Sequence, residues 1–383
     1  MKKTISLPRM HKEAGERRDF LPEFVLKLVT LGHRVLIERG LGSGIGLEDT
    51  AYTRLSPLVS VGDRQEAFQQ DVVLVLRTPE VEEYEALLRP GSILISMLHF
   101  NTRPRRIRKL QQMGVDAISL DSLTDDQGQR LVENTRAVGW NGLETAFTAL
   151  EEDSPGRLAA GGPPIRVTVM GSGAVGKNAV EAATKYGSRA RAAEWGRRGV
   201  PGVEVTTVGR TLTCDPEYLR ARFAQTEILV DATQRPDASR PLIPNEWLGW
   251  LPPDAIVCDL VVDPYVPSGT PPTVRSLEGI PRGDLDQWTF RPNDPKWMRT
   301  IPEGVPTAQR RTTVSCYSWP GIHPEDCMRH YGQQLWPIFQ RLLLRGGVEG
   351  LEEGSETFLD RVLNRASVRS WTPGDADHPP ARV

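Results

Sequence analysis

One short segment constrains the fold of this chain more than any other: a buried-strand pattern that runs directly into a glycine-rich turn. Residues 165–170 (Ile-Arg-Val-Thr-Val-Met) are largely apolar and of strand length, and Gly171-Ser172-Gly173-Ala174-Val175-Gly176 follows without a break. Residues 177–186 then show the alanine- and valine-rich spacing of a helix. A strand, a Gly-x-Gly-x-x-Gly turn and a helix in this order are typical of the first unit of a Rossmann-type dinucleotide-binding domain.

The three glycines have different tasks in such a unit. Gly171 permits the tight turn, Gly173 lets the backbone approach a pyrophosphate, and Gly176 lets the helix pack closely on the strand. The helix N-terminus adds unpaired N–H groups and a positive dipole end. We therefore predict that a dinucleotide cofactor binds at Gly171, Ser172, Gly173, Ala174, Val175 and Gly176. A purely structural glycine turn is the alternative.

The position that reads the adenosine ribose departs from the usual NAD pattern, in which Asp or Glu ends the second strand roughly 20 residues on. Residues 188–201 look like an insertion, and the second strand, expected at 203–208, is followed by Gly209 and Arg210. A guanidinium at this place would pair with a 2′-phosphate. The sequence therefore favours NADP over NAD. The alternative is a surface role for Arg210, with the register altered by the insertion.

Short apolar segments alternate with helix-like segments along the rest of the chain. Continuous apolar strands of this kind are buried on both faces, so we predict an α/β protein with mostly parallel sheets. The chain has 383 residues, enough for two domains. A stretch rich in glycine, proline and acidic residues at 151–164 is the expected linker. The expected strands are residues 4–7, 35–37, 71–76, 92–97, 115–120, 165–170, 203–208, 228–230 and 256–262.

The composition argues against several classes of protein. The 49 acidic and 47 basic residues nearly cancel, to a net charge of −2, so the chain has no overall attraction to nucleic acid or anionic membranes. No apolar run approaches the roughly 20 residues of a membrane span, and the first residues lack the apolar core of a secretory signal. The four cysteines are scattered and predict neither a disulfide framework nor a zinc site. We expect a cytoplasmic protein that binds no metal.

Several segments on both sides of the glycine motif resemble one family in their order and spacing. These segments are residues 11–22, 32–40, 71–79, Leu98-His99, 121–130, 259–263 and 319–324. The chain resembles the superfamily of alanine dehydrogenase and the transhydrogenase N-terminal domain, which includes lysine-forming saccharopine dehydrogenase and carboxyethylornithine synthase. The segment 121–130, with Asp121, Asp126, Gln127, Gly128 and Arg130, is most similar to the saccharopine dehydrogenase branch.

The resemblance implies two Rossmann-like domains with the active site in the cleft between them. Residues 1–150 plus 318–383 would form a discontinuous substrate (catalytic) domain, and residues 160–317 the dinucleotide-binding domain. The implied activity is NAD(P)-dependent oxidoreduction at a C–N bond of an amino acid, by hydride transfer to or from an imine. In an opine- or saccharopine-type reaction, a 2-oxo acid condenses reductively with an amino acid. A homo-oligomer is among the expected states.

The resemblance also implies roles for individual residues. Arg17 matches the arginine that holds the substrate carboxylate, with a solvated arginine as the alternative. His99 matches the catalytic histidine, and an imidazole suits proton exchange near neutral pH. Asp121 matches an acidic residue of the saccharopine site, or it caps a helix. Asp263 matches the aspartate near the nicotinamide. Trp319 replaces a methionine, and its ring is expected to wall the pocket or stack on the substrate, with simple packing as the alternative.

Two positions depart from the relatives. Alanine dehydrogenases have a substrate-binding lysine where Val75 stands, and the saccharopine branch has its catalytic lysine where Arg77 stands. Arg77 can bind a carboxylate or polarise an imine, but arginine does not give up a proton at working pH. The absence of a lysine at position 75 and the segment 121–130 favour the opine or saccharopine type of reaction, whereas Arg77 excludes a proton relay through a lysine. The alternatives are an alanine dehydrogenase (oxidative deamination) and a non-catalytic, transhydrogenase-like nucleotide-binding subunit.

Overall fold

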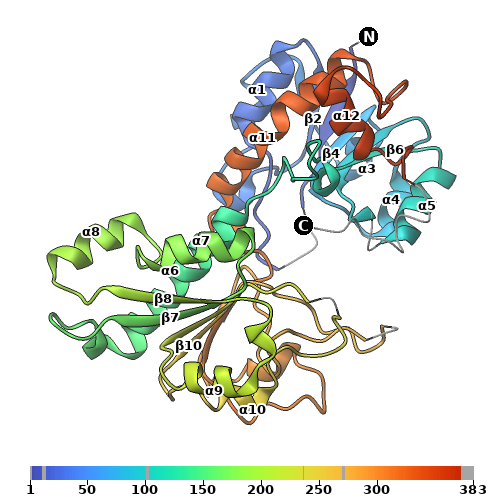
Figure 1. Cartoon of the computed structure of the whole chain (residues 1–383). Helices are drawn as coiled ribbons and strands as arrows, with labels where there is room; N and C mark the ends of the chain where they lie inside the picture. Colours follow the sequence, from blue (N-terminus) through green and yellow to red (C-terminus); the bar gives the residue numbers. More distant parts are fainter. Residues whose placement is uncertain (1, 11–13, 101–102, 236, 270–271, 372–383) are drawn as a thin grey trace. The chain divides into compact units, whose positions relative to one another are not determined.

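A computed structural model describes residues 2–10, 14–100, 103–235, 237–269 and 272–371 (Figure 1). Residues 11–13 of the first family-like segment and residues 372–383 of the expected first domain lie outside the described residues. The chain divides into two compact units. Unit 1 consists of Met1–Asn134 and His323–Val383, and unit 2 consists of Thr135–Ile322.

Unit 1 is built on a parallel sheet of six strands in the order β3-β2-β1-β4-β5-β6. Five of the six strands coincide with apolar runs expected from the sequence, because an extended segment buried on both faces needs apolar side chains at successive positions. The strand that the sequence did not predict, Val59–Gly62, lies at the edge of the sheet, where Ser60 is exposed. The strands are β1 (Thr4–Leu7), β2 (Arg34–Glu38), β3 (Val59–Gly62), β4 (Val72–Arg77), β5 (Ile93–Met97) and β6 (Asp116–Ser119). The helices are α1 (Pro22–Thr30), α2 (Thr50–Thr53), α3 (Arg64–Phe68), α4 (Val81–Leu87), α5 (Pro104–Gln112), α11 (Pro324–Leu344) and α12 (Phe358–Arg365).

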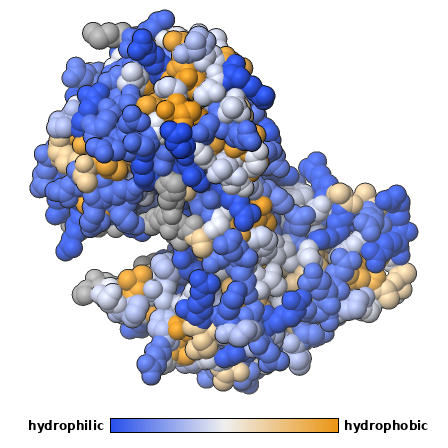
Figure 2. Space-filling model, turned by 180° about the vertical axis from the view of Figure 1, so that it is seen from behind, coloured by the Kyte–Doolittle hydropathy of each residue, from blue (hydrophilic) through white to orange (hydrophobic). Residues whose placement is uncertain are grey.

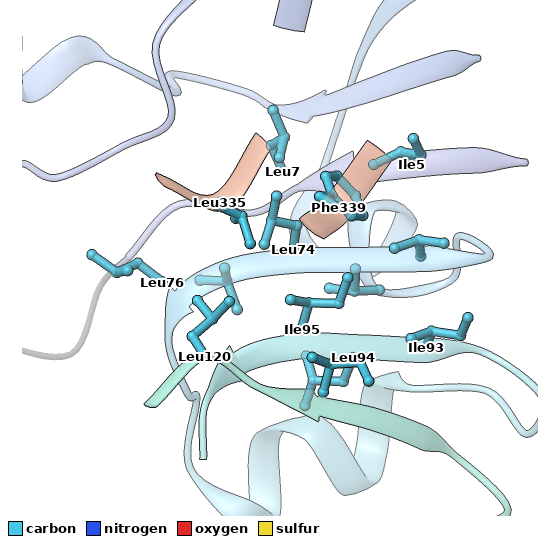
Figure 3. Close-up of a cluster of buried hydrophobic side chains, with 14 of the residues drawn as sticks. Ile5, Leu7, Leu74, Leu76, Ile93, Leu94, Ile95, Leu120, Leu335 and Phe339 are labelled. Atoms are coloured by element: carbon cyan, nitrogen blue, oxygen red, sulfur yellow. The ribbon is translucent and has the colours of Figure 1, made fainter. Parts of the chain in front are cut away.

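The end of the chain completes the core of unit 1. Figure 3 shows Leu335 and Phe339 of α11 beside Leu7 of β1 and Leu74 of β4, and all four side chains are buried in one apolar cluster. The amphipathic face of α11 can leave water only by packing on an apolar surface. This packing joins two separate stretches of chain in one unit.

Unit 2 holds a second sheet of six strands, in the order β11-β12-β10-β9-β7-β8, in which only the edge strand β11 is antiparallel. The predicted α/β class with two Rossmann-like domains is therefore confirmed. The strands are β7 (Ile165–Met170), β8 (Val203–Val208), β9 (Ile228–Asp231), β10 (Ile256–Asp259), β11 (Thr289–Phe290) and β12 (Thr312–Ser315). The helices are α6 (Thr135–Asp153), α7 (Ala174–Ala183), α8 (Arg189–Arg197), α9 (Pro216–Phe223) and α10 (Asn245–Leu248).

The boundaries of the units differ from those that the sequence predicts, residues 150 and 318. Most of α6 falls within the predicted first domain, residues 1–150, but the helix lies in unit 2. Its Phe147 belongs to the apolar core that contains Val167 of β7. Gly139 lets α6 approach α7 closely, since a Cβ at this glycine would lie 2.8 Å from the backbone nitrogen of Ala179. A helical pattern predicts that α6 is buried, but not against which of two sheets.

Hydrophilic residues cover most of the face that Figure 2 shows. The exposed large apolar side chains are scattered through the described residues, and they are Leu26, Leu212, Val266, Met298, Leu344 and Phe358. Within the described ranges, no helix combines the length and the apolar character that a membrane crossing requires.

Candidate active site

Three predicted site residues lie at the carboxyl edge of the unit 1 sheet. Because β4, β5 and β6 are neighbours and parallel, their carboxyl ends meet at the same edge, where open α/β sheets bind ligands. Arg77 is the last residue of β4 and pairs in register with Met97, the last residue of β5. His99 follows β5 by two residues, and Asp121 follows β6 by two residues.

The structure brings His99 and Asp121 into contact. The Nδ1 atom of His99 lies 3.3 Å from Oδ2 of Asp121, and the backbone N–H of His99 donates a hydrogen bond of 3.1 Å to Oδ1. The hydroxyl of Ser119 donates to the same oxygen at 2.8 Å. The side chain of Asp121 is 8% exposed and that of His99 is 46% exposed. The aspartate is thus a buried support for an accessible imidazole.

The environment of Asp121 keeps this support ionised. Burial raises the pKa of the Asp121 carboxyl, but the hydrogen bond and charge of His99 and the hydrogen bond from Ser119 outweigh burial and lower the pKa to about 2. A carboxylate in this position orients the imidazole ring. His99 also has a φ of 54°, in the left-handed region. Non-glycine residues held there concentrate at functional sites.

An arginine near the His99–Asp121 pair, Arg130, was not predicted as a site residue. Its Nη2 atom lies 4.0 Å from Oδ2 of Asp121, and its side chain is 41% exposed. Thr124 and Arg130 form an antiparallel bridge, so the turn after Asp121 folds back. The available signal was the position of Arg130 at the end of the family-like segment 121–130.

Arg17 and Arg18 differ in their surroundings. Arg18 is buried, and it makes two hydrogen bonds to Glu16, from Nε at 2.9 Å and from Nη2 at 2.5 Å. Arg17 is exposed and lies against Gly44, where a Cβ would come within 2.9 Å of the Cγ of Arg17. The side chain of Arg18 is thus engaged by Glu16, and Arg17 stays the candidate for carboxylate binding.

The glycine-rich turn of unit 2 has the geometry that a dinucleotide needs. Gly171 has a φ of 99°, and a Cβ there would lie 2.4 Å from the carbonyl oxygen of Ala232. A Cβ on Gly176 would lie 2.1 Å from the carbonyl oxygen of Gly171, whereas one on Gly173 would meet nothing within 4 Å. Residues 172–174 are exposed at the N-terminus of α7, whose first N–H groups have no partner within the helix. The turn therefore fits a pyrophosphate.

Arg210, the predicted ribose-binding residue, follows the second strand of this unit, β8. β8 pairs with β7, and their last residues, Val208 and Met170, are opposite each other. Gly209 and Arg210 follow, and Arg210 is exposed. The inserted residues 188–201 contain α8 and do not change this register.

Asp263 and Trp319 lie in unit 2, in different surroundings. Asp263 is one-third exposed and forms an ion pair with Arg235. Trp319 is only 2% exposed, and its Nε1 donates a hydrogen bond of 2.8 Å to the carbonyl oxygen of Asp259. The ring of Trp319 is packed in the core of unit 2, which is the alternative that the sequence left open, and its role at the substrate pocket stays a prediction.

Two family models match most of the chain. The model described as alanine dehydrogenase/PNT, N-terminal domain, matches residues 7–133, and the model described as alanine dehydrogenase/PNT, C-terminal domain, matches residues 143–270. The alanine dehydrogenase of Bacillus subtilis (strain 168) is 27% identical over 269 residues, which cover 68% of this chain and 70% of that protein. The alanine dehydrogenase of Halomonas elongata is 24% identical over 272 residues, 68% of this chain and 72% of that protein.

Solved structures agree with the fold. An L-alanine dehydrogenase superposes with a TM-score of 0.69 at 19% identity, over 95% of this chain and 94% of that chain. A transhydrogenase from Sinorhizobium meliloti superposes with a TM-score of 0.60 at 18% identity, over 89% and 94% of the two chains. At these identities the likeness concerns the fold.

Proposed function

Because the chain belongs to the alanine dehydrogenase/PNT family, we propose that it is a nicotinamide-dependent oxidoreductase that acts on the C–N bond of an amino acid. The observation that carries this proposal is the His99–Asp121 pair at the ligand-binding edge of a parallel sheet. An accessible imidazole on a buried carboxylate suits proton transfer to and from an amine or a carbinolamine. The glycine turn of unit 2 supports the nucleotide half of the reaction.

Each residue has a task in this proposal. When bound, the nicotinamide supplies or accepts the hydride. Arg17 and Arg77 bind substrate carboxylates through charge-assisted hydrogen bonds. With Nδ1 of His99 directed at Asp121, Nε2 is the nitrogen that we assign to proton exchange. Asp263 helps to orient the substrate amine or the cofactor.

The substrate we propose is an imine between a 2-oxo acid and an amino acid, as in opine- or saccharopine-type condensation. Val75, where alanine dehydrogenases have a lysine, is 1% exposed within β4 and offers no charge to a substrate. Arg77 and Arg130 add two permanent cations to the loops and strand ends around His99, which suits a product with more than one carboxylate. The curated relatives are named alanine dehydrogenases, so oxidative deamination of alanine is the second candidate.

The oxidation of NADPH and NADH, followed by absorbance, tests this function. Pyruvate or 2-oxoglutarate is combined in turn with ammonia, lysine and ornithine. We expect oxidation with a diamino acid and none with ammonia, since the site we propose binds a substrate with several carboxylates. Oxidation with ammonia and pyruvate alone would replace this proposal by alanine dehydrogenase. Nucleotide binding without turnover on any pair would contradict both and favour a transhydrogenase-like binding subunit.

We also propose that NADP is the preferred cofactor, because Arg210 stands where NAD sites usually have a carboxylate. Replacing Arg210 with alanine is expected to weaken NADPH binding roughly 10-fold, the loss of about 1.4 kcal/mol, and to leave NADH binding unchanged. Fluorescence titrations with both nucleotides measure this ratio. Arg197→Ala, at the exposed end of α8 in the same unit, is the control. Equal losses for both nucleotides, or none, would contradict the role of Arg210.

A further inference from the structure

A buried arginine, Arg235, holds the side chain of Asp263. Arg235 follows β9 by four residues, and its side chain is 5% exposed. Its Nη2 donates to Oδ2 of Asp263 at 2.5 Å and to the carbonyl oxygen of Val274 at 2.7 Å. Its Nη1 donates to the carbonyl oxygen of Arg240 at 2.6 Å. One guanidinium thus joins the loop after β9, the segment after β10 and residue 274 of the proline-rich segment 264–312.

Hydrogen bonds also fix the backbone of the turn that precedes Asp263. Oδ1 of Asp259 accepts hydrogen bonds from the N–H groups of Val261 and Val262, at 3.1 and 3.0 Å. At this turn β10 ends at Asp259, earlier than the predicted strand end at 262, and Val262 has a φ of 55°. A β-branched residue adopts this conformation only where its surroundings impose it. The direction in which Asp263 leaves the turn is therefore set.

A second buried arginine, Arg275, contacts the aspartate that shapes this turn. The guanidinium of Arg275, which is 1% exposed, donates to Oδ2 of Asp259, and the hydroxyl of Ser315 donates to the same oxygen at 2.9 Å. Burial lowers the pKa of Arg275 to about 9. Asp259, which shapes the turn, is thus fixed by β12 and by the same proline-rich segment that contacts Arg235.

Stability alone is a poor explanation for Arg235. A guanidinium taken out of water loses hydration that a buried ion pair often fails to restore, and apolar replacements of such pairs are often neutral or stabilising. The Nε atom of Arg235 is buried and has no hydrogen-bond partner among the described residues. The effect of Arg235 that remains is to fix the position of the Asp263 carboxylate.

We infer that Arg235 is a positioning residue, which holds the Asp263 carboxylate in one orientation for the reaction. The inference rests on the proposed function, in which Asp263 orients the substrate amine or the cofactor. Because Oδ2 of Asp263 pairs with Arg235, Oδ1 is the oxygen that we assign to that contact. Asp263 then acts as a fixed charge and hydrogen-bond acceptor.

A double-mutant cycle of Arg235→Met and Asp263→Asn tests the inference. Arg235→Met is expected to lower kcat by roughly 100-fold, the effect of a misplaced contact at a reacting centre, with a much smaller change in KM. The double variant should lose no more than Asp263→Asn alone, because both changes remove one interaction. Arg235→Lys, which keeps the charge but not the planar fork, should recover part of the loss. The matched control is Arg240→Met, whose side chain is 86% exposed and whose contact with Arg235 is through its carbonyl group.

A second readout, the dissociation constant of NADPH from fluorescence, needs no turnover. Losses of kcat that add in the double variant, or a folded Arg235→Met enzyme with wild-type kcat, would overturn the inference. If Arg235→Met does not fold, wild-type kcat in Arg235→Lys would overturn it. The NADPH measurement also applies if the wild type is inactive on every substrate pair. In that case, non-additive losses of NADPH binding would support the positioning role of Arg235 and contradict the proposed amino-acid substrate. Additive losses would contradict both the positioning role and the proposed substrate.

Discussion

Replacing His99 with asparagine is expected to lower kcat by roughly 10²- to 10⁴-fold, with little change in the unfolding temperature or in NADPH binding. The substitution removes the imidazole that we assign to proton exchange. Asparagine is the suitable replacement because residue 99 has a φ of 54°, and asparagine adopts left-handed backbone more readily than most residues. The side chain is 46% exposed, so the core loses nothing. Initial rates with the active substrate pair and thermal unfolding by circular dichroism measure the two effects.

The companion variant is Asp121→Asn, which keeps the shape of the side chain and removes its charge. Because Asp121 acts through His99, Asp121→Asn should lower kcat less than His99→Asn does. The double variant should have the same kcat as His99→Asn alone. Because the pKa of Asp121 is lowered from 3.8 to about 2, its ionised form stabilises the fold above about pH 4, and this contribution disappears as the pH falls toward 2. The unfolding temperatures of wild type and Asp121→Asn should therefore converge in acid. A His99→Asn enzyme with wild-type kcat would exclude His99 from the mechanism.

Two glycines of one motif are expected to respond differently to alanine. In Gly176→Ala the new Cβ would lie 2.1 Å from the carbonyl oxygen of Gly171, a backbone atom that cannot move aside alone. We expect a loss of about 3 kcal/mol in the free energy of unfolding. In Gly173→Ala the new methyl group meets no protein atom within 4 Å, and a φ of −69° is open to alanine. Unit 2 should stay folded, while NADPH binding weakens roughly 10- to 100-fold, about 1.4 to 2.8 kcal/mol.

Thermal unfolding and fluorescence titration with NADPH separate the two effects. Gly196→Ala is the control, because a Cβ on this glycine of α8 also meets nothing within 4 Å, and we expect it to leave NADPH binding unchanged. Wild-type NADPH affinity in Gly173→Ala would mean that the nucleotide does not approach this turn. A Gly176→Ala protein as stable as the wild type would contradict the packing of α7 on β7.

Much of the candidate site could be predicted residue by residue, but its contacts could not. His99 and Asp121 each follow a predicted strand, and the family resemblance selected both. Their contact depends on β5 and β6 being neighbours in the sheet, and strand order is a property of the whole unit. The sequence did not predict Arg130 as a site residue, although Arg130 ends the segment that also contains Asp121. Nothing in the sequence shows that the turn between Thr124 and Arg130 folds back toward Asp121.

The sequence by itself determined the elements of this protein: parallel α/β units, a glycine turn between β7 and α7, and an arginine after β8. These features are local, since a few consecutive residues specify an apolar strand or a turn that only glycine permits. The tertiary structure alone decided that α6 belongs to unit 2, that Trp319 is buried, and that Arg235 holds Asp263 across 28 residues of chain. Such outcomes depend on which distant segments pack against each other. A local sequence pattern does not specify the partner, because an apolar surface of suitable size can be buried against either of the two cores.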